Sequence, residues 1–399
     1  MKKSKTHELG RRLLFTIMIL TVYMVGRSLL LYHIDPAAYE LAELDTQNIM
    51  ISMISGDRYQ YTLFALGIMP YITATLLIWI FMAVKGAEFR ARFSPQKTER
   101  YTMIFMIFIA ASFAISRADE LVFKESALDP QVLRAIAVLE MTIGAIIIYR
   151  MAFLNKERGI GGQTPLILVN VLDNLFSTIR RFPWEEISKL LVLCLVMAGV
   201  ILIMENVMIR IPVQRVSIHN VYAEKSYIAF KLDPIGVMPV MFAVSFFMIP
   251  QLIVRFLLIL NEDNVTLKLI NERMNLTNLS GAAIYLGIIF ALNIIFSFIM
   301  LSPGEMAEQL QKGGDSIVGV YAGKRTKRYL RRKLLILSVF SGFILCFLMG
   351  IPLRMSLRGE IPSDLALMPA TAMILIGIIC PLYQEVKAYG KFDSYSFFI

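Results

Sequence analysis

Long apolar stretches alternate with short polar segments along the whole chain. A helix needs roughly 20 apolar residues to cross the hydrocarbon core of a bilayer. Nine stretches meet this requirement and are predicted to be transmembrane helices: 13–31, 63–84, 101–117, 132–154, 187–209, 235–257, 281–301, 334–353 and 364–384. A further stretch, 164–179, is shorter and contains Pro165, Asn170, Asp173 and Asn174, so hydropathy alone leaves it undecided.

The distribution of positive charge favours a crossing by 164–179 as well. With ten spans and a cytoplasmic N-terminus, most of the 40 Lys and Arg residues fall in cytoplasmic segments. Without this crossing, the strongly basic segment 303–333 would face outward, against the positive-inside rule. We therefore predict ten transmembrane helices with both termini in the cytoplasm. The polar helix 164–179 has to be shielded from lipid, which is typical of a helix that lines a pathway.

Composition agrees with a membrane protein and argues against several other classes. The chain is 57% hydrophobic and 18% charged, whereas soluble domains are about 45–50% apolar and about 25% charged. The net charge of +10 follows from the predicted topology and needs no nucleic-acid partner. Cys194, Cys346 and Cys380 lie within apolar stretches without paired spacing, and the histidines form no metal-binding pattern. We predict no enzyme, no cofactor and, because no phosphate-binding loop is present, an external source of energy.

A short motif occurs twice, in the second and the seventh predicted span. It reads Gly67-Ile68-Met69-Pro70 in one and Gly236-Val237-Met238-Pro239 in the other. These spans are equivalent if the chain divides into two five-helix halves, 1–179 and 180–399, which would then be inverted repeats. Matching Gly/Pro interruptions in inverted halves indicate the functional axis of a channel or a transporter. Chance recurrence of the motif is the alternative.

The motif and its surroundings also carry a family resemblance. The stretch 64–74 resembles the second-helix hallmark of the SecY family, and 157–161, 210–214, 230–243 and 303–330 are similar to family segments in the same order. The resemblance implies an all-α bundle that is the central pore subunit of a protein translocase. Such a channel passes unfolded preproteins across the bacterial plasma membrane and laterally into it. The alternative from another class of membrane protein is a secondary transporter, which would need charged groups near the membrane midplane.

Departures from the usual family pattern indicate one branch of it. Residues 318–323 replace a run that usually contains an arginine, so that Tyr321 stands at the arginine position, and the loop between the sixth and seventh spans is short. The chain thus looks most like the accessory SecY paralogue of Gram-positive bacteria, which exports serine-rich glycoprotein adhesins. The housekeeping SecY channel is the alternative within the family.

The resemblance also implies a ring of apolar side chains at the waist of the pore. By motif, its members are Ile68, Ile72, Leu168, Leu172, Met241 and, in the tenth span, Ile374. The pairs 68/72 and 168/172 are spaced i, i+4 and so share one helical face. An apolar constriction can exclude water and can close around a chain of any sequence. Ordinary packing within the bundle is the alternative reading.

The segment 46–62, between the first two spans, corresponds to an external plug. Its residues suit a short amphipathic helix above a pore: Ile49, Met50, Ile51, Met53, Ile54, Ser55 and Gly56. A loop that lies on the membrane interface is the alternative.

Two cytoplasmic segments, 208–233 and 303–333, correspond to the family's docking surface for a SecA-type ATPase motor. The candidate contact residues are Arg210, Arg215, Lys225, Tyr321, Lys324 and Arg325. Apolar alternation over 213–221 and 227–232 predicts a protruding β-hairpin. Tyr321 in place of arginine predicts a different, accessory motor. The alternative for the basic run 324–333 is that it only sets the membrane topology. The other partners that the resemblance implies are small SecE- and SecG-like or accessory Sec subunits, the preprotein and membrane lipids.

Overall fold

The computed structural model of the chain describes residues 8–35, 61–85, 94–119, 121–124, 129–214, 226–260, 265–273, 278–362, 365 and 368–395. Most of these residues are helical, and each of the ten predicted ranges coincides with a helix of its own. The long helices are α1 (Glu8–Ser28), α3 (Met69–Lys85), α5 (Pro95–Ala118), α6 (Pro130–Arg158), α7 (Thr164–Arg181), α8 (Trp184–Asn206), α9 (Met238–Leu260), α11 (Leu279–Leu301), α13 (Lys324–Leu357) and α15 (Met368–Tyr395). Two short helices accompany them, α10 (Val265–Arg273) and α12 (Pro303–Lys312).

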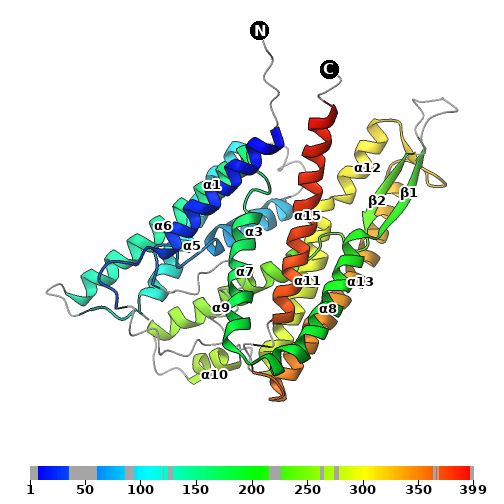
Figure 1. Cartoon of the computed structure of the whole chain (residues 1–399). Coiled ribbons are helices and arrows are strands. Elements are labelled where there is room, and N and C mark those ends of the chain that lie inside the picture. The colour runs from blue at the N-terminus through cyan, green and yellow to red at the C-terminus, as the bar shows by residue number, and fades with distance from the viewer. Residues whose placement is uncertain are drawn as a thin grey trace, which may run out of the picture.

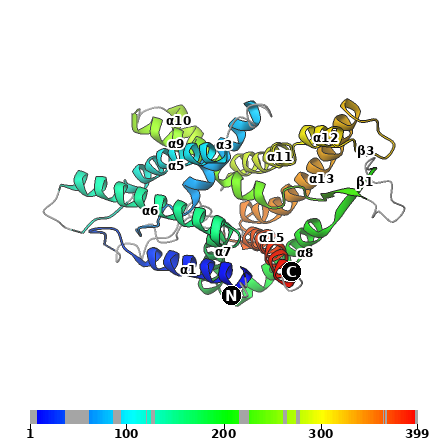
Figure 2. The same ribbon diagram turned by 90° about the horizontal axis from the view of Figure 1, so that it is seen from above.

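The bundle has two sides with a shared middle. Figure 2 shows α1, α5 and α6 on one side and α8, α11 and α13 on the other. Between them, α3 packs against α9, and α7 packs against both α1 and α15. The start of α1, the end of α15 and the strands lie at one end of the bundle, and α10 lies at the other (Figure 1).

Many helices present apolar side chains outward, as a membrane protein does. Among the described residues, six helical segments are long and apolar enough to cross a membrane by length and composition: Glu8–Ser28, Gln96–Ala118, Pro130–Arg158, Leu279–Lys312, Lys324–Leu357 and Met368–Lys391. Shorter apolar helices are Met69–Met82 and Leu190–Asn206. Side chains such as Phe108 and Phe347 are about 70% exposed, which is favourable only against lipid or another apolar partner. The chain is a multi-pass membrane protein.

The predicted hairpin is present and begins earlier than expected. Strands β1 (Met208–Gln214) and β2 (Tyr227–Lys231) are antiparallel, with Met208 opposite Lys231, and β3 (Ser316–Ile317) pairs with the far end of β1. Helix α8 ends at Asn206, so residues that were counted in the predicted span 187–209 belong to β1. The basic run 324–333 is also not a loop, because α13 is helical from Lys324 onward.

The two polar segments fold together on a small core of their own. This core consists of Ile211, Phe230, Ala307, Ile317, Leu330, Leu334 and Leu337. It joins the hairpin, α12 and the first turns of α13 into one unit, which we call the hairpin module (208–214, 226–233 and 303–337). The hairpin, α12 and the first turns of α13 are therefore held together by their own hydrophobic core at one end of the bundle.

Candidate functional site

The two copies of the Gly-x-Met-Pro motif have the same local structure. Gly67 and Gly236 both adopt positive φ, +53° and +71°, which glycine does without a steric penalty. A helix begins two residues after each glycine, α3 at Met69 and α9 at Met238. Proline is tolerated there because the first helical N–H groups lack partners anyway. The predicted span 63–84 was therefore too long at its start: residues 61–68 form turns, and the helix starts inside the bundle.

Each helix start places a pair of side chains toward the middle of the bundle. In α3, the Ile72 N–H donates to the Ile68 carbonyl over 3.1 Å. In α9, the Met241 N–H donates to the Val237 carbonyl over 3.3 Å. Ile68, Ile72, Val237 and Met241 are all buried and belong to one hydrophobic cluster. The repeat predicted from the sequence thus has a structural counterpart at the centre of the molecule.

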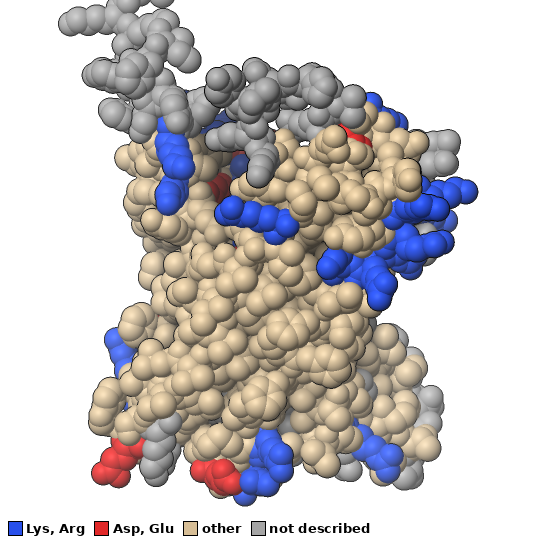
Figure 3. Space-filling view, turned by 90° about the vertical axis from the view of Figure 1, so that its right-hand side faces the viewer, with Lys and Arg blue, Asp and Glu red and all other residues tan. Residues whose placement is uncertain are grey.

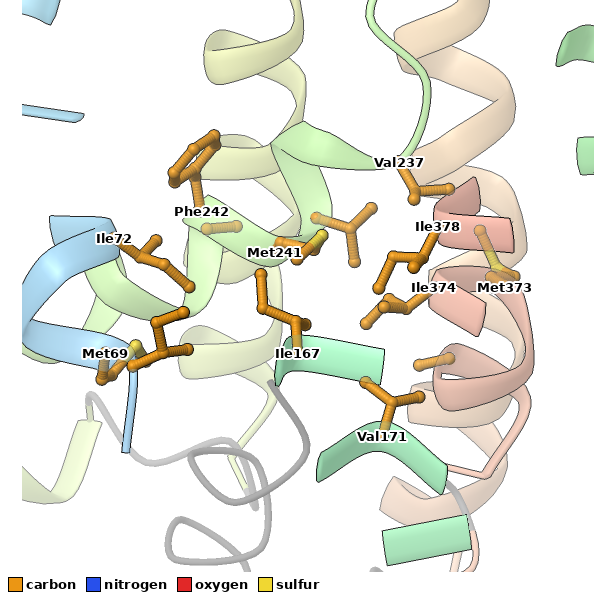
Figure 4. Packing of buried hydrophobic residues seen from close by; sticks show 14 of the residues in the cluster. Met69, Ile72, Ile167, Val171, Val237, Met241, Phe242, Met373, Ile374 and Ile378 are labelled. Carbon is orange, nitrogen blue, oxygen red and sulfur yellow. The ribbon is translucent and has the colours of Figure 1, made fainter. Parts of the chain in front are cut away.

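The cluster brings apolar side chains together from four helices. Figure 4 shows Ile72 of α3, Ile167 and Val171 of α7, Met241 of α9 and Ile374 and Ile378 of α15 directed toward a common centre. Phe242 packs beside them, with its ring edge-on to Phe296 of α11. We call Ile72, Ile167, Val171, Met241 and Ile374 the central constriction. Its members are aliphatic or Met side chains, whereas a coupled transporter would need charged groups at this place.

The α7 members of the constriction differ from the prediction by one position. Ile167 and Val171 are at most 3% exposed, whereas Leu168 and Leu172 are half-buried. Since successive residues in a helix are about 100° apart, Leu168 and Leu172 point well to one side of the centre. Leu168 still packs against the edge of the cluster.

The polar face of α7 explains this rotation. The Tyr23 hydroxyl of α1 donates to Asn170 Oδ1 over 2.8 Å, and Arg27 of α1 pairs with Asp173 over 2.7 Å. These contacts satisfy Asn170 Oδ1 and Asp173, two of the polar groups that made 164–179 a weak predicted span, whereas Asn170 Nδ2 is buried without a partner among the described residues. Because they hold the polar face of α7 on α1, Ile167 and Val171 face the centre. The polar residues were expected to line a pathway, but Asn170 and Asp173 bind α1 instead.

One cavity adjoins the constriction, and a second, larger one meets the first at Gln163 and Thr164. The smaller one, about 100 Å³, is lined by Ile72, Gln163, Thr164, Ile167, Glu205, Ile235, Val237, Met238, Met241, Phe242, Gly377, Ile378 and Pro381. The larger one, about 390 Å³, lies among α3, α5, α6 and the start of α7 and also includes Gln163 and Thr164. Together they open a partly polar space next to an apolar waist.

The described candidates for motor contact are exposed on the hairpin module. The Arg210 guanidinium lies 4.9 Å from the centre of the Tyr227 ring, and the Arg325 guanidinium lies 5.1 Å from that of Tyr321. Tyr321 is 75% exposed, and Lys324 is exposed at the start of α13. On the face shown in Figure 3, Lys and Arg gather toward the end where the termini lie, and a broad uncharged band crosses the middle. Arg215, Lys225 and the predicted plug residues 49–51 and 53–56 lie outside the described residues.

The fold and the constriction define a helical membrane protein with an apolar waist next to partly polar cavities, an arrangement that fits a channel. The family model for SecY matches residues 62–383. The chain therefore belongs to the SecY family of protein-translocation channels, as its sequence motifs indicated.

Relatives and solved structures agree with this assignment. The chain is 26% identical to the accessory Sec system protein translocase subunit SecY2 of Streptococcus sanguinis (strain SK36), over 96% of the chain and 97% of that protein. It is 27% identical to the protein of the same name from Leuconostoc gelidum subsp. gasicomitatum, over 98% and 97%. Among solved structures, a protein-conducting channel aligns with a TM-score of 0.65 at 16% identity, over 98% of the chain and 95% of the other. Sec61 in the canine ribosome–channel complex aligns with a TM-score of 0.62 at 16% identity, over the same shares.

Proposed function

We propose that the chain is the pore subunit of an accessory Sec translocase in the bacterial plasma membrane. The observation that carries this proposal is the central constriction. Helices of both predicted halves contribute to it, and it lies next to the partly polar cavities described above. A ring of flexible aliphatic and Met side chains seals against water when empty. It also contacts an extended polypeptide without requiring a particular sequence, since dispersion contacts need no fixed partner.

The proposed topology places the hairpin module in the cytoplasm together with both termini. The proposal includes ten spans in two inverted halves, 1–179 and 180–399, and it is supported by the equivalent positions of α3 and α9 and by the basic residues on the module. The proposed partners are a SecA-type motor at the hairpin module and small SecE- and SecG-like or accessory Sec subunits around the bundle. The plug at 46–62 is part of the same proposal.

The accessory role rests on the names of the relatives and on Tyr321. The relatives described above are named as accessory Sec subunits, and their length matches that of this chain. Tyr321 is exposed and stacked on Arg325, so a motor that recognises an arginine at this position would meet an aromatic surface instead. We infer that the motor is an accessory paralogue and that the cargo is a serine-rich glycoprotein adhesin.

Site-specific photocrosslinking tests the pore assignment. A photoreactive amino acid at position 72 or 241 is expected to crosslink to a preprotein that is stalled during translocation, because both side chains belong to the constriction. Position 192 is the matched control, since Val192 of α8 is 63% exposed on the outside of the bundle and is expected to give no preprotein adduct. Absence of adducts at both 72 and 241 would remove the pore assignment.

A further inference from the structure

A buried group of charged residues lies where the hairpin module joins α9. Lys231, the last residue of β2, places its ammonium nitrogen 2.8 Å from Glu205 Oε2 near the end of α8. The Glu205 side chain is only 4% exposed, and Asp233, two residues beyond Lys231, is 1% exposed. Two buried carboxylates thus lie beside a lysine whose side chain is 29% exposed, next to a constriction that itself contains no charged group.

This group touches both the hairpin and the helix that carries Met241. The Leu232 N–H donates to the Val207 carbonyl over 2.8 Å, which ties the end of β2 to the end of α8. On the other side, the Glu205 carboxylate lies so close to Gly236 that a Cβ there would overlap Oε1. Gly236 precedes α9 by two residues, and Glu205 also lines the small cavity beside Met241. A displacement of β2 therefore reaches the start of α9 through these side chains.

Asp233 is held by hydrogen bonds but is not fully satisfied. The backbone N–H groups of Ile235 and Gly236 and the hydroxyl of Ser341, on α13, donate to its carboxylate. Among the described residues, its Oδ1 atom has no hydrogen-bond partner. A buried carboxylate oxygen without a partner is costly when ionised, and far less so when it carries a proton.

Burial and the surrounding charges leave the ionised and the protonated forms of Asp233 almost equally populated near neutral pH. Burial, followed by the nearby Glu205 carboxylate, raises the pKa of Asp233 to about 7, while the three hydrogen bonds act in the opposite direction. Asp233 lies between β2 and α9, outside both flanking helices. The other titratable groups here are Glu205 on α8 and Lys231 on β2, with Cys380 of α15 beside these two. With Asp233 ionised the trio Glu205, Lys231 and Asp233 carries one net negative charge, and with Asp233 protonated it is neutral.

Ser341 allows the hydrogen bonds to follow the proton. Its Oγ accepts from Asn293 Nδ2 of α11 over 2.8 Å and can donate to the Ser338 carbonyl at 3.3 Å or to Asp233. When Asp233 is ionised, the Ser341 hydroxyl donates to it. When Asp233 is protonated, the acid can donate to Ser341 Oγ, and Ser341 then donates to Ser338. Both states are hydrogen-bonded, but only the protonated state avoids a buried net charge.

We propose that Asp233, Glu205 and Lys231 form a proton-sensitive joint that couples the position of the hairpin module to the start of α9 and thereby to Met241. Protonation of Asp233 favours the tightly packed joint. Ionisation loosens the segment 232–237, and so does a motor that draws Lys231 away from Glu205. The coupling to a motor rests on the proposed function, whereas the response to protons belongs to the chain alone.

Trp79 offers a local reporter for this joint. Its ring lies on α3, 6.3 Å from that of Phe242 on α9, in an edge-on arrangement across the seam between the two helices. The only other tryptophan is Trp184. In a Trp184→Phe background, Trp79 emission of the purified chain in detergent is expected to change with pH, with a midpoint near neutral pH.

Three variants separate the joint from other titrating groups. Asp233→Asn, which is nearly isosteric and always neutral, is expected to abolish the transition and to keep the low-pH signal. Glu205→Gln should shift the midpoint to lower pH, because it removes a like charge and leaves Lys231 free to favour ionised Asp233. Ser341→Ala should shift it to higher pH, because the net effect of Ser341 is to lower the pKa of Asp233: its bond to the ionised form outweighs its bond to the protonated form.

The outcomes decide the proposal in both directions. A transition that is lost in Asp233→Asn and moved oppositely by the other two variants supports it. A signal that does not titrate, or an Asp233→Asn protein that keeps the transition, overturns it. The Glu205 and Ser341 shifts keep the test decisive if one variant fails to fold. The readout uses neither motor nor preprotein, so its failure is distinguishable from failure of the crosslinking experiment.

Discussion

Gly236 is the single residue on which the geometry before α9 depends most. Its φ of +71° is unfavourable for any residue with a side chain, and the Glu205 carboxylate occupies the place where a Cβ would lie. A substitution therefore meets backbone strain and a displaced buried charge at the same position. Both effects act on the joint between the hairpin module and the constriction.

Gly236→Ala is expected to destabilise the protein by about 1–3 kcal/mol, as residues forced into unfavourable backbone regions do. Thermal unfolding in detergent measures the change. Gly199→Ala is the matched control, because a Cβ at Gly199 of α8 has no neighbour within 4 Å and alanine favours a helix by roughly 0.5–1 kcal/mol. Equal effects of the two substitutions would contradict the argument.

At the scale of elements, α7 is the helix whose orientation matters most. Its apolar residues alone allow two rotations, one with Leu168 and Leu172 toward the centre and one with Ile167 and Val171 there. The contacts of Asn170 and Asp173 with α1 select the second. Asp173 is about half exposed, so its ion pair contributes little, and the buried Tyr23–Asn170 hydrogen bond is the stronger of the two.

Tyr23→Phe is expected to lower the stability of the protein by about 0.6–1.7 kcal/mol, the range found for hydrogen bonds between membrane helices. The reason is that Asn170 loses its partner inside the bundle. Tyr383→Phe serves as control, because Tyr383 is 64% exposed and should tolerate the change. Unfolding in detergent compares the two, and an equally neutral Tyr23→Phe would show that this bond does not hold α7 in place.

For the whole molecule, the arrangement of charge and termini predicts how the protein sits in the membrane. The hairpin module, the start of α1 and the end of α15 lie at one end, and α10 lies at the other (Figure 1). The positive-inside rule assigns the basic module to the cytoplasm.

Cysteine labelling tests this orientation. In a background without Cys194, Cys346 and Cys380, Tyr321→Cys is expected to react with a membrane-impermeant maleimide only in inverted vesicles. Ser280→Cys, which replaces an exposed residue near the start of α11, is expected to react only in intact protoplasts. Labelling of both positions from one side would contradict the proposed topology.

Sequence reasoning succeeded where the physics is local or one-dimensional. Apolar length predicted nine of the ranges and the distribution of positive charge predicted 164–179, and all ten ranges coincide with helices. Pro70 and Pro239 restrict the backbone, and Gly67 and Gly236 permit a positive φ. The motif therefore indicated an interruption in each span, although the predicted span 63–84 ran across the first one. The same motif led to the SecY family. The pore role of Ile72, Met241 and Ile374 stays a prediction, although all three belong to the buried central cluster.

The remaining features depend on partners that are distant in the chain. Hydropathy could not show which face of α7 points inward, because that choice is made by Tyr23 and Arg27 of α1, about 147 and 146 residues away. The same holds for the joint. Glu205, Lys231 and Asp233 look like ordinary polar residues at the ends of spans, and only the packing of α8, β2 and α13 buries the two carboxylates beside Lys231. The sequence by itself determined a membrane bundle with two broken helices, and the tertiary structure decided which side chains meet at its centre, because burial and pairing arise only when separate helices come into contact.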